Sequence, residues 1–300
     1  NFQSFGIMDR KSRKQRRKKT MSEKEKETGE IEERDGFIAI PDGSLYYKKY
    51  DIQGKVGLPV VLLHGNRGTH RDFSSYIEVL TKAGCSVIAM DSRGHGASVM
   101  KMAALKAAVL KTGRSQEKGK RRWTGAADMA EDVVRLLDHL KIEKAVILGF
   151  SDGANTALEF AADHPERAEK IIAVSANALP DGLIPPMLFM ENTRFQCAKI
   201  LENIKPVGKF GKWCKREQFL SSLILHSPFL TEERLKKISV PVLLMAGTHD
   251  LIKESHTRII ARCIPGSRLV LIKGGTHQGF FRKKERYIGE ILKFIFDERC

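Results

Sequence analysis

Three side chains in this sequence have the types and the order that covalent hydrolysis by a serine requires. Ser151 lies in the pentapeptide GFSDG (149–153), and Asp250 and His277 follow it along the chain. A serine hydroxyl is a weak nucleophile until a base accepts its proton, and a carboxylate commonly orients that base. We therefore take Ser151 as the candidate nucleophile, His277 as the general base and Asp250 as the acid that orients the histidine.

The segments on either side of Ser151 predict how its hydroxyl would be presented. The apolar run KAVILGF at 144–150 predicts a buried strand, and the alanine-rich segment 154–161 has helical spacing. A sharp turn from strand to helix strains the serine backbone, so the residues two before and two after it must be small. A serine that merely caps the helix is the alternative, but it would not explain both glycines.

Asp250 and His277 each follow an apolar run that predicts a strand. VPVLLMAGTH precedes Asp250 and RLVLIKGGT precedes His277, so both side chains should emerge at the sheet edge where Ser151 lies. The alternatives are a turn or helix cap for Asp250 and a plain loop histidine for His277. His249 and His256 are competing bases, but neither follows a final strand.

The oxyanion that forms during acyl transfer needs two backbone N–H donors. Asp152, directly after the nucleophile, is one candidate, and Asn66 in the loop HGNRG (64–68) is the other. Glycines in that loop let the backbone approach a substrate closely, although an ordinary glycine-rich turn has the same composition.

The remaining chain alternates between short apolar runs and helix-period segments, which indicates an α/β protein with a largely parallel sheet. A hairpin is expected at 37–40 and 45–50, and a helix at 129–140. We assign 36–178 and 238–298 to the core, with a basic insert at 99–123, and 179–237 to a helical cap. The expected buried strands are 59–63, 86–90, 144–150, 170–175, 240–246 and 268–272.

The net charge of +16 is concentrated in two segments. Residues 1–20 hold eight Lys and Arg against one acid, and residues 101–122 also hold eight against one. The polar, charged composition of 1–35 predicts a disordered tail. The N-terminal segment lacks the apolar stretch of about 7–15 residues that a secretory signal needs, so we expect a cytoplasmic protein. The five cysteines are widely spaced and lack the spacing of metal ligands, so we expect free thiols.

The segments LLHGN, AMDSRGHGAS, LGFSDGAN, LLMAGTHD and GGTHQGF, in this order, resemble the α/β-hydrolase superfamily, in its branch of compact esterase-like and C–C-hydrolase-like enzymes. The resemblance covers 36–298. It implies an α/β-hydrolase fold, with a mostly parallel eight-stranded sheet flanked by helices and a small helical cap. It also implies a covalent acyl-enzyme and no cofactor or metal. Asp91 and His95 match the family's structural turn, so they are expected to be scaffold residues.

The insert at 99–123 departs from the pattern of the resemblance. Met102, Leu105 and Val109 have helical spacing, and the segment is strongly basic. A solvated surface helix and loop is one interpretation, and a basic amphipathic anchor for an anionic membrane or a polyanion is the other.

Two functions therefore follow from the sequence. The first is hydrolysis of a small, apolar carboxylic ester, or of a related acyl or carbon–carbon bond, by a serine hydrolase acting on a small-molecule substrate. The second is a non-catalytic binding protein on a hydrolase scaffold, whose basic tail and insert contact nucleic acid or an anionic membrane. The intact set of Ser151, Asp250 and His277 favours the enzyme. The substrate's identity and the oligomeric state are left open.

Overall fold

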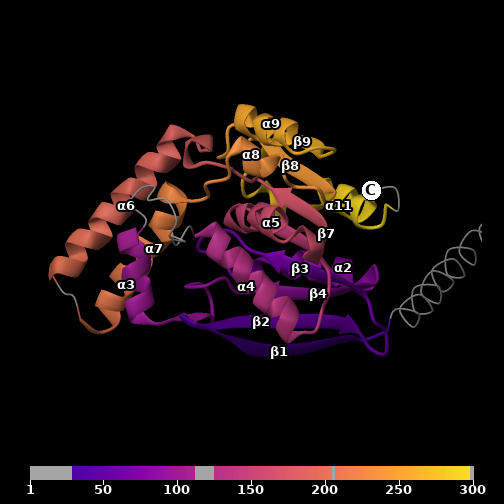
Figure 1. The fold of residues 1–300 in the computed structure, drawn as a ribbon, viewed down its shortest axis with the longest axis horizontal. Coiled ribbons are helices and arrows are strands. Elements are labelled where there is room, and N and C mark those ends of the chain that lie inside the picture. Colours follow the sequence, from indigo (N-terminus) through magenta and orange to yellow (C-terminus); the bar gives the residue numbers. More distant parts are fainter. Residues whose placement is uncertain (1–28, 112–124, 205–206, 298–300) are drawn as a thin grey trace, which may run out of the picture.

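The computed structural model describes residues 29–111, 125–204 and 207–297. In these residues nine strands form one mixed sheet in the order β1-β2-β4-β3-β6-β7-β8-β9, with β5 paired to β2 (Figure 1). The strands are β1 Ile31–Ile40, β2 Gly43–Ile52, β3 Leu58–Leu63, β4 Cys85–Met90, β5 Val99–Met100, β6 Ala145–Phe150, β7 Ala168–Val174, β8 Val242–His249 and β9 Arg268–Thr276.

The six strands from β4 to β9 along this order are parallel, and β1, β2 and β5 join through antiparallel pairs. The predicted mostly parallel sheet and its six buried strands are confirmed. The sheet has nine strands instead of eight because β5 adds a two-residue pairing, which is too short to leave a periodic signal.

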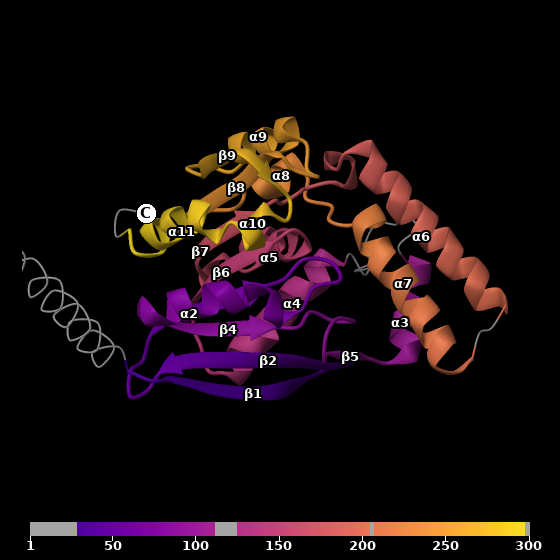
Figure 2. The same ribbon diagram turned by 180° about the vertical axis from the view of Figure 1, so that it is seen from behind.

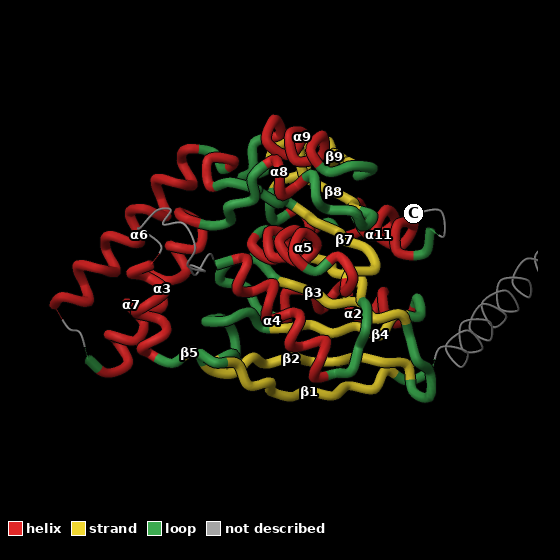
Figure 3. The backbone as a smooth tube through the Cα atoms, in the orientation of Figure 1, coloured by secondary structure: helices red, strands yellow, loops and turns green. Residues whose placement is uncertain are grey.

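Helices cover both faces of the sheet, as Figure 3 shows in red against yellow strands. The α-helices are α2 Ser74–Lys82, α3 Met102–Lys111, α4 Ala126–His139, α5 Asp152–Asp163, α6 Pro185–Ile204, α7 Gly208–His226, α8 Glu232–Leu235, α9 Glu254–Cys263, α10 Gly279–Arg282 and α11 Ile288–Ile295. Short 3₁₀ helices are η1 His70–Phe73, η2 Pro165–Arg167, η3 Pro180–Gly182 and η4 Lys284–Arg286.

The alternation of side chains along the strands divides the interior into two cores. In β3, Val61 and Leu63 pack with residues of α4 and α5, whereas Val60 and Leu62 pack with residues of α2 and α11 (Figure 2). Successive side chains of a strand point to opposite faces, so a sheet covered on both sides needs apolar residues at every position. The two cores hold the strand ends, and therefore the loops that follow them, in fixed positions.

The first strand begins earlier than the sequence predicts. Residues 31–35, which we assigned to the charged tail of 1–35, form the first half of β1 and pair in register with β2. Their charges suit an edge strand, where Glu33 pairs with Lys48 and Glu32 with Arg34. Residues 29–30 precede β1 without regular structure, and residues 1–28 lie outside the described residues.

The cap contains a helical hairpin and part of the insert. Helices α6 and α7 pack against each other beside the sheet, and α3 packs against α7 (Figure 1). The helix predicted from Met102, Leu105 and Val109 is confirmed, but its apolar face packs on Phe219 and Leu223 of α7. The apolar face of α3 is thus covered by the cap, while Lys101 and Ala103 are exposed. Contact of the insert with an anionic membrane or a polyanion stays a prediction. Residues 112–124 lie outside the described residues.

The predicted cap boundary at 237 is also too late. Leu230 and Leu235, on either side of the start of α8, are buried in the core that contains α5 and α9. The chain has therefore returned to the core before β8 begins, and the part of 179–237 that lies over the strand ends is mainly α6 and α7.

Two further features of the described residues are the state of the cysteines and the length of the apolar helices. Cys85, Cys214 and Cys263 are buried free thiols, and Cys197 is an exposed one. Cys300 lies outside the described residues. No helix in the described part of the chain is both long and apolar enough to cross a membrane.

Candidate active site

Ser151 occupies the turn between β6 and α5. Its backbone has φ 54° and ψ −119°, a strained conformation for a residue with a side chain. A Cβ at Gly149 would lie 2.1 Å from the carbonyl oxygen of Gly153, and one at Gly153 would lie 2.0 Å from that of Leu63. Both glycines are thus sterically required. The Ser151 side chain makes no capping hydrogen bond to α5, which rules out the helix-cap interpretation.

The structure brings the three predicted side chains into one hydrogen-bonded row. His277, directly after β9, places Nε2 3.2 Å from Ser151 Oγ and Nδ1 2.6 Å from Asp250 Oδ1. The carboxylate of Asp250 has no proton to donate, so the hydrogen bond between them requires a proton on Nδ1 of His277. In a neutral ring with that proton, Nε2 is free to accept a hydrogen bond from the serine hydroxyl. This arrangement lets His277 take a proton from Ser151.

Besides His277, three other groups in the described part of the chain donate hydrogen bonds to Asp250. Its side chain is 1% exposed, and its Oδ2 accepts a hydrogen bond from Ser175 Oγ at 2.6 Å. The backbone N–H groups of Gly247 and Ile252 donate to the two carboxylate oxygens at 3.3 Å. Burial by itself would raise the pKa of Asp250, but the hydrogen bonds from His277, Ser175 and the Ile252 N–H lower it overall.

Ser175 contacts the carboxylate of Asp250 and is not among the site residues predicted from the sequence. It follows β7, the strand next to β8, and it has a left-handed backbone with φ 57°. Only the pairing of β7 with β8 brings its hydroxyl to Asp250, since the two residues are 75 positions apart. The one available signal was the end of the apolar run at 170–175.

The competing histidines lie elsewhere. His249 is exposed at the end of β8, and His256 is buried in α9, where its Nε2 accepts a hydrogen bond from the N–H of Ala178. Asp91 and His95 are buried in the turn after β4, where Asp91 accepts hydrogen bonds from the N–H and Nδ1 of His70. None of these four side chains lines the cavity above Ser151.

A cavity of about 150 Å³ lies over Ser151, at the carboxyl ends of the parallel strands. Loops after β3, β6, β7, β8 and β9 line it from the sheet side, and α6 and α7 line it from the cap side. Its walls are Gly65, Asn66, Arg67, Phe150, Ser151, Asp152, Asn177, Leu183, Met187, Glu191, Arg194, Ile224, Leu251, His277 and Gln278.

Asn66 and Asp152, the predicted oxyanion donors, both line this cavity. Their side chains are joined, because Asn66 Nδ2 donates to Asp152 Oδ2 at 2.8 Å and to the Leu220 carbonyl of α7 at 2.9 Å. A Cβ at Gly65 would lie 3.1 Å from Ser151 Cβ, so the glycine permits the close approach of this loop. The loop and the turn after β6 are therefore fixed relative to each other.

A charged network continues from Asn66 into the cap. Arg67 donates to Asn66 Oδ1 at 2.8 Å and to Ser221 Oγ at 3.0 Å, and it lies 3.1 Å from Glu191 Oε2. Glu191 is fully buried and also accepts from Arg194 at 2.9 Å. Sequence reasoning did not find this network, because Glu191 and Arg194 lie on the predicted cap without any motif around them.

Asp152 is the acid closest in sequence to the nucleophile. Burial raises the pKa of its carboxyl, although the hydrogen bond from Asn66 and the charge of Arg67 lower it in part. Asp152, together with Asn66 and Arg67, forms a polar wall of the cavity. Leu183, Met187, Ile224 and Leu251 give it an apolar wall.

Comparisons with known proteins identify the family of this chain. A family model described as the alpha/beta hydrolase fold matches residues 59–203. The chain is 27% identical to the serine hydrolase BPHL of Homo sapiens, over 83% of this chain and 82% of that protein. It is 32% identical to the putative carbamate hydrolase RutD of Caulobacter vibrioides, over 82% of this chain and 94% of that protein.

Solved structures show the same fold. Carboxylesterase CesB (YbfK) from Bacillus subtilis superposes with a TM-score of 0.66 at 19% identity, covering 89% of this chain and 92% of that one. The enol-lactonase from Burkholderia xenovorans LB400 superposes with a TM-score of 0.64 at 21% identity, covering 87% and 99%. From its sequence relatives and its fold together, this chain belongs to the α/β-hydrolase superfamily.

Proposed function

We propose that this protein is a serine hydrolase that cleaves small carboxylic esters through an acyl-enzyme. The observation that carries the proposal is the row from Asp250 through His277 to Ser151, with Ser151 Oγ at the floor of a cavity. The family and the hydrolases among its relatives support hydrolysis as the class of reaction.

The proposed chemistry begins when His277 Nε2 takes the Ser151 proton while Oγ attacks the ester carbonyl carbon. The resulting oxyanion would accept hydrogen bonds from the backbone N–H groups of Asn66 and Asp152. His277 then gives the proton to the leaving alkoxide, and the alcohol departs from the acylated serine. A water molecule deprotonated by His277 attacks the acyl carbon, and Ser151 leaves with its proton restored.

The size and walls of the cavity favour a small substrate. About 150 Å³ accommodates only a few heavy atoms beyond the reacting carbonyl. The aliphatic wall formed by residues such as Leu183 and Ile224 suits a short apolar acyl group, while Asn66 and Asp152 face the reacting centre. We therefore propose short-chain esters in preference to long-chain lipids.

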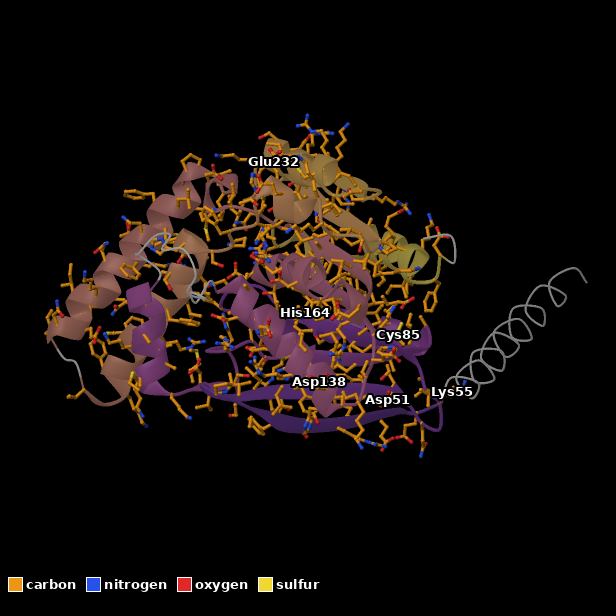
Figure 4. The ribbon with its side chains drawn as sticks, in the orientation of Figure 1. Asp51, Lys55, Cys85, Asp138, His164 and Glu232 are labelled. Atoms are coloured by element: carbon orange, nitrogen blue, oxygen red, sulfur yellow. The ribbon has the colours of Figure 1, made fainter. Side chains whose placement is uncertain are left out.

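Covalent labelling with a fluorophosphonate tests the nucleophile. The wild-type chain should be labelled once, Ser151→Ala should not be labelled, and hydrolysis of p-nitrophenyl acetate and butyrate should fall by about 10³-fold or more. Ser86→Ala is the matched control, because it removes a buried serine hydroxyl that lies away from the cavity and donates to Asp51 at 2.6 Å. Figure 4 labels Asp51 at the end of the sheet away from the cap helices.

Two outcomes would contradict the proposal. One is equal labelling of the wild-type chain and Ser151→Ala, and the other is a folded wild-type chain that neither reacts with the probe nor hydrolyses any ester. The second outcome, with retention on heparin at moderate salt, would instead favour the non-catalytic binding protein.

A further inference from the structure

The far end of the cap hairpin carries a cluster of exposed apolar side chains. Figures 1 and 2 show from both sides that α6 and α7 meet at the end of the hairpin farthest from the sheet. We name the cluster the tip patch and define it by Ile200 (59% exposed), Leu201 (36%), Ile204 (74%), Val207 (68%), Phe210 (38%) and Trp213 (46%). Phe189 and Met190 are also exposed but lie near the start of α6, at the other end of that helix. Other large exposed apolar residues lie in the core domain, such as Phe37 in β1, Val56 in the loop before β3 and Ile259 in α9.

Lysines surround the tip patch. Lys199, Lys209 and Lys212 are exposed, and none of them pairs with a carboxylate among the described residues. The acid in this region, Glu202, is already bound to Lys215 at 2.5 Å. The tip therefore combines apolar side chains with an uncompensated positive charge.

We propose that the tip patch docks on an anionic lipid surface by inserting its apolar side chains at the level of the headgroups. Segments that lie in a membrane interface combine Trp, Phe and aliphatic residues with lysines that bind anionic lipids. The rings of Phe210 and Trp213 stack with centroids 5.9 Å apart, which gives the tip one broad aromatic surface. Tryptophan is the residue most typical of this interface.

The same charges disfavour a second copy of the chain as the occupant. A two-fold interface built on the tip patch would place the lysines of both copies, including Lys209 and Lys212, around one small apolar contact. Like charges at an interface oppose association, whereas an anionic bilayer attracts them.

The proposed contact leaves the cavity outside the bilayer. Glu191 lines the cavity and Ile204 lies in the tip patch, 13 residues along the same helix, which corresponds to about 20 Å. The contact therefore determines where the protein is located and does not deliver membrane lipid to Ser151. Ester hydrolysis in solution should be unaffected by it.

Vesicle sedimentation tests the proposal with the full chain. Wild-type protein should bind vesicles of phosphatidylcholine with 30% phosphatidylglycerol at low salt. Its binding to vesicles of pure phosphatidylcholine should be at least tenfold weaker. Ile204→Ser with Val207→Ser should reduce the binding at least tenfold. Val56→Ser, at an exposed apolar residue far from the cap in sequence, is the matched control and should change vesicle binding less than twofold.

Two further variants examine the charge and the depth of contact. Lys209→Glu with Lys212→Glu should also reduce binding to anionic vesicles at least tenfold. In a Trp123→Phe background, Trp213 is the sole tryptophan, and its emission should shift to shorter wavelength when anionic vesicles are added. Because all these tip residues are exposed, unchanged thermal unfolding checks that each variant is folded.

Three outcomes would overturn the proposal. The first is a wild-type chain that does not bind anionic vesicles. The second is undiminished binding by the tip variants, which would assign membrane contact to the basic N-terminal segment. The third is a dimer in sedimentation equilibrium that Ile204→Ser with Val207→Ser converts to a monomer, which would make a second copy the occupant.

Discussion

The carboxylate of Asp250 depends on a hydroxyl group that no motif contains. Ser175 donates to it at 2.6 Å and does not line the cavity, so we expect it to be a positioning residue. A hydrogen bond to a charged group contributes about 1.5–3 kcal/mol, and Asp250 keeps two backbone donors without it. Ser175→Ala should therefore lower kcat for a short ester by about tenfold, with KM changed less than twofold.

The control for this prediction is Ser86→Ala, which removes a hydroxyl that donates to the half-buried carboxylate of Asp51 at the same distance but away from the site. Its kcat should match that of the wild-type chain even if its stability falls. A similar loss of kcat in both variants would mean that Ser175 acts only through stability.

The sequence could predict those site residues whose position follows from the end of a strand. Ser151, Asp250 and His277 each come directly after an apolar run, and parallel strands bring such positions to one edge. Ser175 and Glu191 could not be predicted in this way. The contact of Ser175 depends on which strand lies beside β8, and the burial of Glu191 depends on how α6 packs over the cavity.

At the scale of elements, the turn between β6 and α5 has no room for a side chain at either glycine. A Cβ at Gly153 would lie 2.0 Å from a backbone oxygen of β3, which cannot move without disturbing the sheet. Gly153→Ala should lower the free energy of unfolding by about 3 kcal/mol or more and abolish fluorophosphonate labelling. Urea unfolding followed by circular dichroism measures the first effect.

Gly289→Ala is the matched substitution in a helix. Its Cβ would meet no atom within 4 Å, and the residue lies within α11. Alanine is favoured over glycine in a helix, so this variant should be as stable as the wild-type chain or more stable by up to about 1 kcal/mol. Equal effects of the two substitutions would contradict the steric interpretation of the turn.

The docking of α3 on α7 is the arrangement of elements that the sequence left unresolved. Helical spacing predicts that α3 is amphipathic, but it does not identify what covers the apolar face. The central strands were predictable because both of their faces are apolar, whereas the charged half of β1 and the two residues of β5 have no such pattern.

Leu105→Ala tests whether the insert supports the cap. Leu105 is 6% exposed and packs among residues of α7, so its truncation should lower the free energy of unfolding by about 2 kcal/mol. Because α7 accepts the hydrogen bond that holds Asn66, kcat should also fall. Val99→Ala, at an exposed residue in β5, should change neither value. Wild-type kcat in Leu105→Ala would mean that α3 does not support the active site.

At the scale of the whole molecule, buried histidines should determine how stability responds to acid. His64 Nε2 accepts a hydrogen bond from the N–H of Ser92 at 3.0 Å, and His256 Nε2 accepts one from the N–H of Ala178 at 3.0 Å. Neither Nε2 atom can carry a proton while it accepts, so both rings are neutral in the folded chain. Burial lowers the pKa of both, and burial together with the neighbouring His64 lowers the pKa of His95 further.

The direction of the pH effect follows from these lowered pKa values. Below about pH 6.5 the unfolded chain binds protons that the folded chain does not, so the free energy of unfolding falls as the pH decreases. The loss continues until the pH passes the folded-state pKa values, at up to about 1.4 kcal/mol per pH unit for each proton. Stability should therefore be constant near pH 7.5 and decline from pH 6.5 to pH 5.

His256→Gln separates this titration from other acid effects, because glutamine offers an acceptor to Ala178 without gaining a proton. Urea unfolding between pH 7.5 and pH 5 should show a slope smaller by up to about 1.4 kcal/mol per pH unit than in the wild-type chain. An unchanged slope in His256→Gln would mean that His256 takes up its proton equally in the folded and unfolded chains.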